Sequence, residues 1–129
     1  MTHPNEELVR KGYQALASGD TDALQEQIAD DVVWHVGGRS QLAGDYRGKE
    51  EVFNLFGKLI ELTGGTFKLE VHDILANDEH TVALVKATAQ RDGKALDDNG
   101  VQVLHVQDGK VKESWLHPGD EYASDEFFS

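Results

Sequence analysis

The sequence predicts an α+β fold in which a curved sheet packs over three helices. Up to Leu62, apolar side chains recur mostly at the three- and four-residue spacing of helices, and from Thr66 onward they alternate in strands. The chain has 129 residues, 39% of them hydrophobic, which fits a single domain spanning residues 1–129. It contains no Cys, so packing alone must supply the core.

Two helices are expected at the start of the chain. Asn5 is the candidate N-cap of the first and Gly19 its stop, while Asp20 can cap a second helix that extends to about Ala29. The two helices would form a hairpin. The inward face of the first helix is expected to carry Leu8, Val9, Gly12, Tyr13, Leu16 and Ala17.

A strand and a third helix follow. Residues 32–36 are β-branched and aromatic and end at Gly37-Gly38, which is typical of a short strand. Residues 37–48 are expected to form a loop. The third helix runs from about Lys49 to Leu62, because apolar residues keep helical spacing there until Gly64-Gly65 ends the pattern.

Four further strands complete the predicted order ααβαββββ. They cover residues 66–76, 81–91, 101–107 and 110–117, and turn signals at 77–78, 92–93 and 108–109 separate them. Asp97-Asp98-Asn99 is expected to precede the strand that begins at Val101. The tail from Tyr122 to Phe128 carries three aromatic residues, and we expect it to fold back over the mouth of the sheet or onto a partner subunit.

Charge and composition disfavour several classes of function. A formal net charge of -12 opposes binding to nucleic acid or to an anionic membrane, because phosphate is bound by Lys and Arg. No basic region followed by an apolar stretch opens the chain, and no apolar run approaches the roughly 18 residues of a membrane span. We therefore expect a cytoplasmic protein. The six His form no helical metal-binding pair, so neither a metal nor a cofactor is expected.

Four fragments, taken in order, resemble a known family. They are Tyr13-Gln-Ala-Leu-Ala-Ser-Gly-Asp20, Ala29-Asp-Asp-Val-Val-Trp-His35, Gly44-Asp-Tyr-Arg-Gly48 and Asp108-Gly-Lys-Val-Lys-Glu-Ser-Trp115. These fragments are similar to the signature of SnoaL-like polyketide cyclases, which share a cone-shaped α+β fold with ketosteroid isomerase and nuclear transport factor two. The resemblance spans nearly the whole chain and implies that the sheet curves into a cone around the helices.

The same resemblance implies that the familiar acids are absent from this chain. In ketosteroid isomerase one aspartate moves the proton, while a tyrosine and a protonated aspartic acid stabilise the dienolate oxygen. Those positions fall on Val36, Gly12 and Gln102, with Tyr13 beside Gly12, and the aspartate base of the cyclases falls on Leu116. Isomerase or cyclase chemistry by the familiar route is therefore disfavoured. Tyr13 and Gln102 still offer hydrogen bonds.

The register of the last hairpin decides which side chains face the interior of the cone. A two-residue type I′ turn at 108–109 places Gln102 opposite Trp115, whereas a turn with a Gly bulge at 107–109 places it opposite Ser114. The resemblance favours the bulge. The inner face then carries Gln102, Leu104, Val106, Ser114 and Leu116, and the outer face carries Val103, His105, Val111, Glu113 and Trp115. Because an exposed Trp115 needs cover, we expect a homodimer through the outer face.

Two functions follow from this interpretation. The first is binding of a small apolar or aromatic molecule in the cone pocket, with cofactor-free isomerase, cyclase or hydrolase chemistry as an extension and Asp98, Gln102 and Tyr13 as candidate catalytic residues. The alternative is a non-catalytic dimeric protein-interaction module. An interior filled by aromatic side chains would favour the module, and a pocket with converging polar groups would favour ligand binding. The candidate ligand-binding residues are Tyr13, Trp34, Val36, Phe53, Phe56, Val85, Ala87, Gln102, Leu104, Ser114 and Leu116.

Overall fold

The computed structural model describes residues 3–129 and contains helices and strands in the order ααββαββββα. The predicted α+β class is confirmed, with one strand and one helix beyond the predicted order. The elements are α1 (Pro4–Ser18), α2 (Thr21–Gln27), β1 (Ile28–Val36), β2 (Gly44–Arg47), α3 (Gly48–Leu62), β3 (Lys68–Ala76), β4 (His80–Arg91), β5 (Lys94–Gln107), β6 (Lys110–His117) and α4 (Glu121–Phe127).

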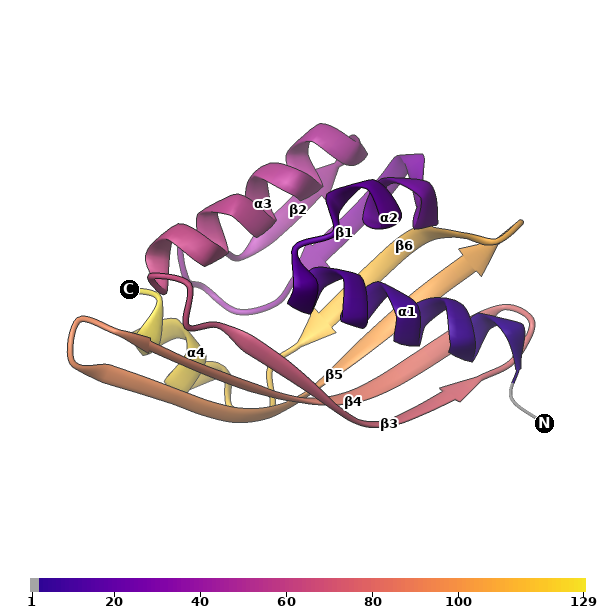
Figure 1. The fold of residues 1–129 in the computed structure, drawn as a ribbon. Helices are drawn as coiled ribbons and strands as arrows, with labels where there is room; N and C mark the ends of the chain where they lie inside the picture. The colour runs from indigo at the N-terminus through magenta and orange to yellow at the C-terminus, as the bar shows by residue number, and fades with distance from the viewer. Residues whose placement is uncertain (1–2) are drawn as a thin grey trace.

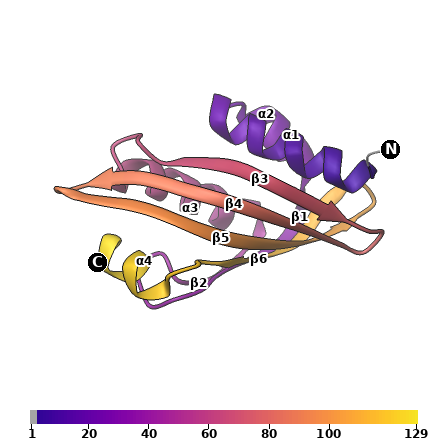
Figure 2. The ribbon, with the colours of Figure 1, turned by 90° about the horizontal axis from the view of Figure 1, so that it is seen from below.

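The six strands form one mixed sheet in the order β2-β1-β6-β5-β4-β3. Strands β1 and β6 are parallel, and every other neighbouring pair is antiparallel. Figure 1 shows α1, α2 and α3 on one face of the sheet, with the long β4–β5 hairpin beneath them, and Figure 2, seen from below, shows the hairpin crossing in front of α3. The start of α1 and the end of α4 lie toward opposite ends of the sheet. The helices and the curved sheet therefore enclose the interior between them.

The first two helices begin and end at recognisable signals, one of which differs from the prediction. His3, not Asn5, is the N-cap of α1, because its ring Nδ1 accepts a hydrogen bond from the Asn5 backbone N–H. Pro4 then occupies the first helical position, where its missing N–H is harmless. Gly19 ends the helix with a φ of 75°, as expected, and the Asp20 side chain caps α2.

Two segments predicted as irregular are strands. Residues 44–47 form β2, which pairs antiparallel with residues 33–36 of β1, so the prediction of a loop over 37–48 was wrong at its end. Strand β5 begins at Lys94, because Asp92 and Gly93 make a two-residue turn with φ values of 50° and 78°. Asp97, Asp98 and Asn99 consequently lie inside β5 rather than before it.

The last hairpin combines a tight turn with a bulge, and neither predicted register is correct. Asp108 and Gly109 form a two-residue turn with φ values of 54° and 74°. Beyond the turn the register shifts between His105 and Val106, and Gln102 pairs with Leu116. The shift inserts one extra residue into β6. The residues predicted on the inner face therefore stay there, and Val111, which was expected on the outer face, is buried in the core as well.

The C-terminal tail folds back onto its own subunit as α4. Asp120 caps the helix, and Phe127 and Phe128 are buried against Leu42 and Leu96. Several hydrogen bonds hold the tail from outside the helix. These are Arg91 Nη1 to the Phe127 and Ser129 oxygens, Lys94 Nζ to the Glu126 oxygen, and Gln41 Nε2 to the Phe128 oxygen. The expected fold-back over the mouth is therefore observed within one chain.

None of the helices within residues 3–129 combines the length and apolarity required to cross a bilayer.

Candidate ligand-binding site

A cavity of about 160 Å³ lies between the helices and the inner face of the sheet. Its wall is predominantly apolar, with contributions from every helix and from most strands. Several sequence-predicted residues contribute to it. These are Tyr13, Trp34, Val36, Phe56, Val85, Ala87, Gln102, Leu104 and Leu116.

Three polar side chains form a hydrogen-bonded relay across one side of the interior. Tyr13 on α1 donates its hydroxyl proton to Gln102 Oε1 on β5, and Gln102 Nε2 donates to Ser114 Oγ on β6 over 2.8 Å. Gln102 is 5% exposed and Ser114 is fully buried. The alternation of side chains along a strand brings Gln102 and Ser114 to the same face, and α1 lies above them. The relay therefore satisfies a buried amide that would otherwise be destabilising.

Burial also fixes the charge state of Tyr13. The surrounding apolar side chains raise the pKa of its hydroxyl well above the ordinary value, because the phenolate would lose its hydration. Tyr13 consequently keeps its proton at neutral pH. It can act in a hydrogen bond, as a donor or through its oxygen lone pairs, but it is not poised to act as a base.

Aromatic side chains form another part of the wall. Trp34 and Phe56 meet edge to face with ring centroids 5.4 Å apart, and both line the cavity. Phe53 packs on the far side of Phe56, within the cluster around Val32, and does not reach the lining. Ser114 lies behind Gln102 and is likewise outside the lining. These two candidates therefore support cavity residues from behind.

Asp98 is the carboxylate that reaches the wall within the described part of the chain. Its Oδ2 accepts a hydrogen bond from the Gly119 backbone N–H, and its Oδ1 accepts one from that of Asp120, both over 3.0 Å. Because both oxygens hold the start of the tail, Asp98 connects the cavity wall to the segment that closes it. It is half-buried within β5, although the sequence placed it before the strand.

Comparison with known proteins identifies the family. The SnoaL-like domain matches residues 9–114 of the chain. The chain belongs to this family. Bal32a, from a soil-derived mobile gene cassette, is 39% identical, with a TM-score of 0.95 over 98% of this chain and 97% of that one.

Two further relatives extend the comparison. An uncharacterised protein of Mycobacterium tuberculosis is 31% identical over 95% of each chain. An NTF2-like protein of Burkholderia xenovorans is 22% identical, with a TM-score of 0.85 over 100% of this chain and 98% of that one, which shows a shared fold. The cone-shaped fold expected from the sequence is thereby confirmed for this SnoaL-like domain.

Several lining residues of the SnoaL-like domain were missed by the sequence interpretation. Leu42 comes from the loop before β2, Leu96 from the unpredicted start of β5, and Phe128 from the tail. Their apolar character signalled burial, but only the fold-back of the tail and the length of β5 place them at the cavity. Phe128 is the clearest omission, because it seals one end of the interior and is 5% exposed.

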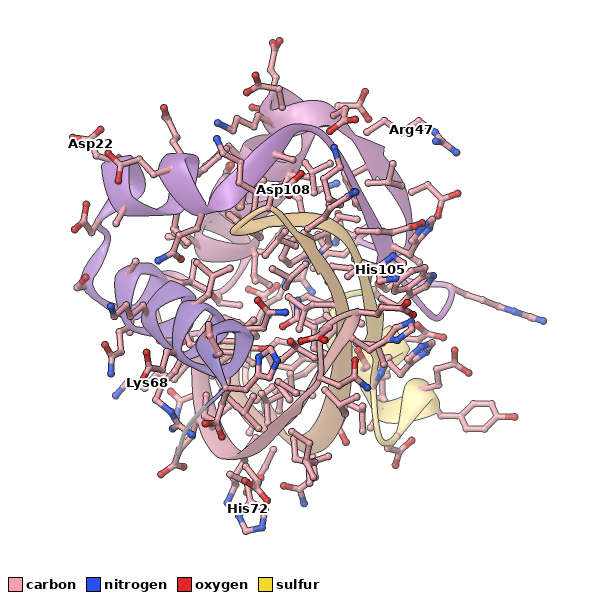
Figure 3. All side chains as sticks on the ribbon, turned by 90° about the vertical axis from the view of Figure 1, so that its right-hand side faces the viewer. Asp22, Arg47, Lys68, His72, His105 and Asp108 are labelled. Atoms are coloured by element: carbon pink, nitrogen blue, oxygen red, sulfur yellow. The ribbon has the colours of Figure 1, made fainter. Side chains whose placement is uncertain are left out.

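The outer face of the sheet carries a cluster of imidazole and indole rings. His35 stacks on Trp115 with centroids 5.5 Å apart, and its two ring nitrogens lie 2.6 Å from carboxylate oxygens of Asp45 and Glu113. The hydrogen bond to Glu113 is the main cause of a raised pKa for His35. His105, on the sheet face away from α1 in Figure 3, stacks on His80 over 4.7 Å. Within residues 3–129 no group of three metal-ligating side chains is assembled.

Proposed function

We propose that this SnoaL-like domain binds a small apolar or aromatic molecule in its cavity, with Tyr13 and Gln102 as the polar anchor. The observation that carries the proposal is an apolar cavity into which a satisfied hydrogen-bonded pair projects. Small-molecule sites typically combine apolar walls with a few placed polar groups. Its volume, about 160 Å³, is close to the roughly 150 Å³ of an engineered cavity that binds benzene.

Cofactor-free acid–base chemistry is the finer part of the proposal. Val36 and Leu116 line the cavity at positions where the family resemblance implies a base, and neither can accept a proton. Asp98 is the remaining carboxylate at the wall, and both of its oxygens already accept backbone hydrogen bonds. These observations favour binding over proton transfer. Any isomerase, cyclase or hydrolase activity would rest on Asp98, Gln102 and Tyr13.

The test of the anchor is calorimetric titration of benzamide into the wild type, Gln102→Leu and Gln107→Leu. Gln107 is the matched control because it lies on the same strand but is exposed. We expect Gln102→Leu to weaken binding by about tenfold, as loss of one hydrogen bond implies, and Gln107→Leu to bind as the wild type. Equal affinity in all three proteins, with the fold intact by circular dichroism, would contradict the anchor. A wild type that binds neither benzamide nor toluene at millimolar concentration would contradict the cavity proposal.

A homodimer through the outer face is a second proposal, and the specific observation that favours it is the ring cluster around Trp115. In this alternative the protein is a dimeric interaction module without catalysis. Native mass spectrometry of the purified protein tests both ideas, because it reports subunit number and retained molecules together. A monomer would contradict the dimer. The cytoplasmic location and the lack of a nucleic-acid partner stay predictions that rest on the sequence and its charge of -12.

A further inference from the structure

The charge of the cavity wall restricts what can bind there. Among the described residues that line the cavity there is no Lys, Arg or His, and Asp98 is the single charged side chain. An anion inside would therefore lose its hydration without gaining a cationic partner, which is strongly unfavourable. The surface adds to this effect, because the formal net charge is -12.

Two cationic side chains at the ends of the β4–β5 hairpin strands, Arg91 and Lys94, are bonded to the tail. Arg91 Nη1 donates to the Phe127 oxygen over 3.0 Å and to the Ser129 oxygen over 2.9 Å. Lys94 Nζ donates to the Glu126 oxygen over 3.0 Å. Both side chains therefore donate hydrogen bonds to oxygens of the tail, and neither lines the cavity. Asp98, at the same end, presents negative charge to anything that enters.

A cationic ligand is disfavoured for a different reason. The two oxygens of Asp98 each accept a backbone N–H from the tail, so about two of the four lone-pair sites of this carboxylate are left for a ligand ammonium. The remaining wall is mostly apolar. Its further polar side chains, Gln27, Ser40 and Ser124, are uncharged, so an ammonium would lose its hydration there without a second carboxylate.

The relay instead suits a neutral polar group. With its proton donated to Gln102, Tyr13 keeps oxygen lone pairs that can accept from a ligand O–H or N–H. The relay can also be reversed: if the Gln102 amide rotates by 180°, Ser114 donates to Oε1, Nε2 donates to Tyr13, and the Tyr13 proton is free for a ligand carbonyl. Both orientations satisfy every member of the relay, so the anchor accepts donors and acceptors alike but supplies no charge.

From these contacts we propose that the cavity selects uncharged ligands of about single-ring size that carry one hydroxyl, carbonyl or amide group, and that it excludes carboxylates and ammonium ions of the same shape. This inference rests on the proposed binding function and adds the chemical class of the ligand. The aromatic edges of Trp34 and Phe56 provide the apolar contact, and the relay provides the polar one.

Four probes of similar shape and different charge test the proposal: benzamide, benzyl alcohol, benzoate and benzylammonium, titrated at pH 7 by calorimetry. We expect benzamide and benzyl alcohol to bind. Benzoate should bind at least tenfold more weakly than benzamide, and benzylammonium at least tenfold more weakly than benzyl alcohol. Benzoate or benzylammonium that binds as tightly as benzamide would overturn the charge selection while leaving the binding function intact. Absence of binding by all four would overturn the binding function itself.

Two variants locate the origin of the selection. Asp98→Asn removes the charge at the wall, and Asp97→Asn, one residue earlier and exposed on the other side of β5, removes the same charge outside the cavity. We expect Asp98→Asn to reduce the ratio of benzamide affinity to benzoate affinity at least threefold. Asp97→Asn should leave this ratio of affinities unchanged. The wild-type ratio should persist at 0.5 M NaCl, because a buried wall is weakly screened. A ratio that collapses in salt would assign the selection to the surface charge and contradict the role of the wall.

Discussion

Replacing Ser114 by Ala should lower the free energy of unfolding by about 2 kcal/mol, because it breaks the relay at its most buried member. Ser114 is fully buried, and its Oγ accepts the 2.8 Å hydrogen bond from Gln102 Nε2. Alanine removes only one oxygen, so little packing is lost, but the Gln102 amide keeps an N–H without a partner. An unpaired buried polar group typically costs about 1–3 kcal/mol.

Urea denaturation followed by tryptophan fluorescence, at one fixed protein concentration, measures this loss. With a slope of about 1–3 kcal/mol/M for a small protein, the midpoint should fall by roughly 1 M. Ser18→Ala is the control, because Ser18 is exposed and its hydroxyl donates only to a helix-end carbonyl oxygen over 3.2 Å. It should change stability by less than about 0.5 kcal/mol.

A triple variant separates the relay from ordinary packing. Tyr13→Phe, Gln102→Leu and Ser114→Ala together remove every polar member, so no relay atom is left unpaired. The triple variant should therefore lose less stability than the sum of the three single changes, since replacing both partners of a hydrogen bond can be nearly neutral. A Ser114→Ala loss below about 0.5 kcal/mol, or strict additivity in the triple variant, would refute the relay as described.

Three further predictions concern residues outside the relay. Gly119→Ala should undock the tail and lower the melting temperature, because a Cβ there would overlap the Asn99 backbone oxygen. Gly57→Ala is its control: a Cβ at this position on α3 meets no atom, so the free energy of unfolding should rise by about 1 kcal/mol. Thr81→Val should raise the free energy of unfolding by about 1 kcal/mol in urea, because Thr81 Oγ1 is buried without a partner among the described residues. His35→Gln should destabilise the protein most below pH 6.5. The pKa of His35 is raised in the folded protein, chiefly by the hydrogen bond to Glu113. The stabilisation from His35 is therefore complete below the pKa of the unfolded chain and is lost as pH rises through the pKa of the folded protein. Urea titrations of both proteins across pH would show a constant difference if this reasoning is wrong.

The helices and the central strands could be predicted because their local signals agree with the fold. Helix α3 has apolar residues at helical spacing and ends before Gly64-Gly65, and its observed bounds differ from the predicted ones by one residue. Strand β6 coincides with its predicted range of 110–117. In α3 one face is buried and the other is exposed, so the period of the sequence reports the geometry directly.

The missed elements lack that agreement between local pattern and structure. Strand β2 is four residues long, at the edge of the sheet, and its sequence Gly-Asp-Tyr-Arg has one apolar side chain. Its strand geometry comes from pairing with β1, which is a tertiary effect. Likewise, the acidic residues 97–99 read as a turn, although Leu96 and Asp98 both face the cavity from within β5.

The sequence predicts which face of the sheet carries the site residues, but not the register between β5 and β6. Because side chains alternate between the two faces along a strand, Gln102, Leu104 and Ser114 are predicted on the inner face. A shift of the register by two residues keeps all three there. The bulge changes which residues lie opposite one another, and it brings Val111 inward. A bulge of this kind leaves no specific signal in Lys110 to Glu113. The sequence therefore indicated the relay's members on the sheet without indicating that Gln102 and Ser114 are hydrogen-bonded.

The two faces of the sheet in this SnoaL-like domain differ in which side chains can change charge. On the inner face, Val36, Gln102 and Leu116 occupy the positions where the family resemblance implies acids, so these three side chains cannot change charge near neutral pH, and Tyr13 is held protonated by burial. On the outer face, one residue away along β1, His35 titrates between two carboxylates. Because successive side chains of a strand point to opposite faces, pH should alter stability through His35 while leaving the affinity for a neutral ligand nearly constant. Ligand affinity that follows the titration of His35 would mean that the two faces are coupled through β1, and the neutral relay alone would then not account for binding.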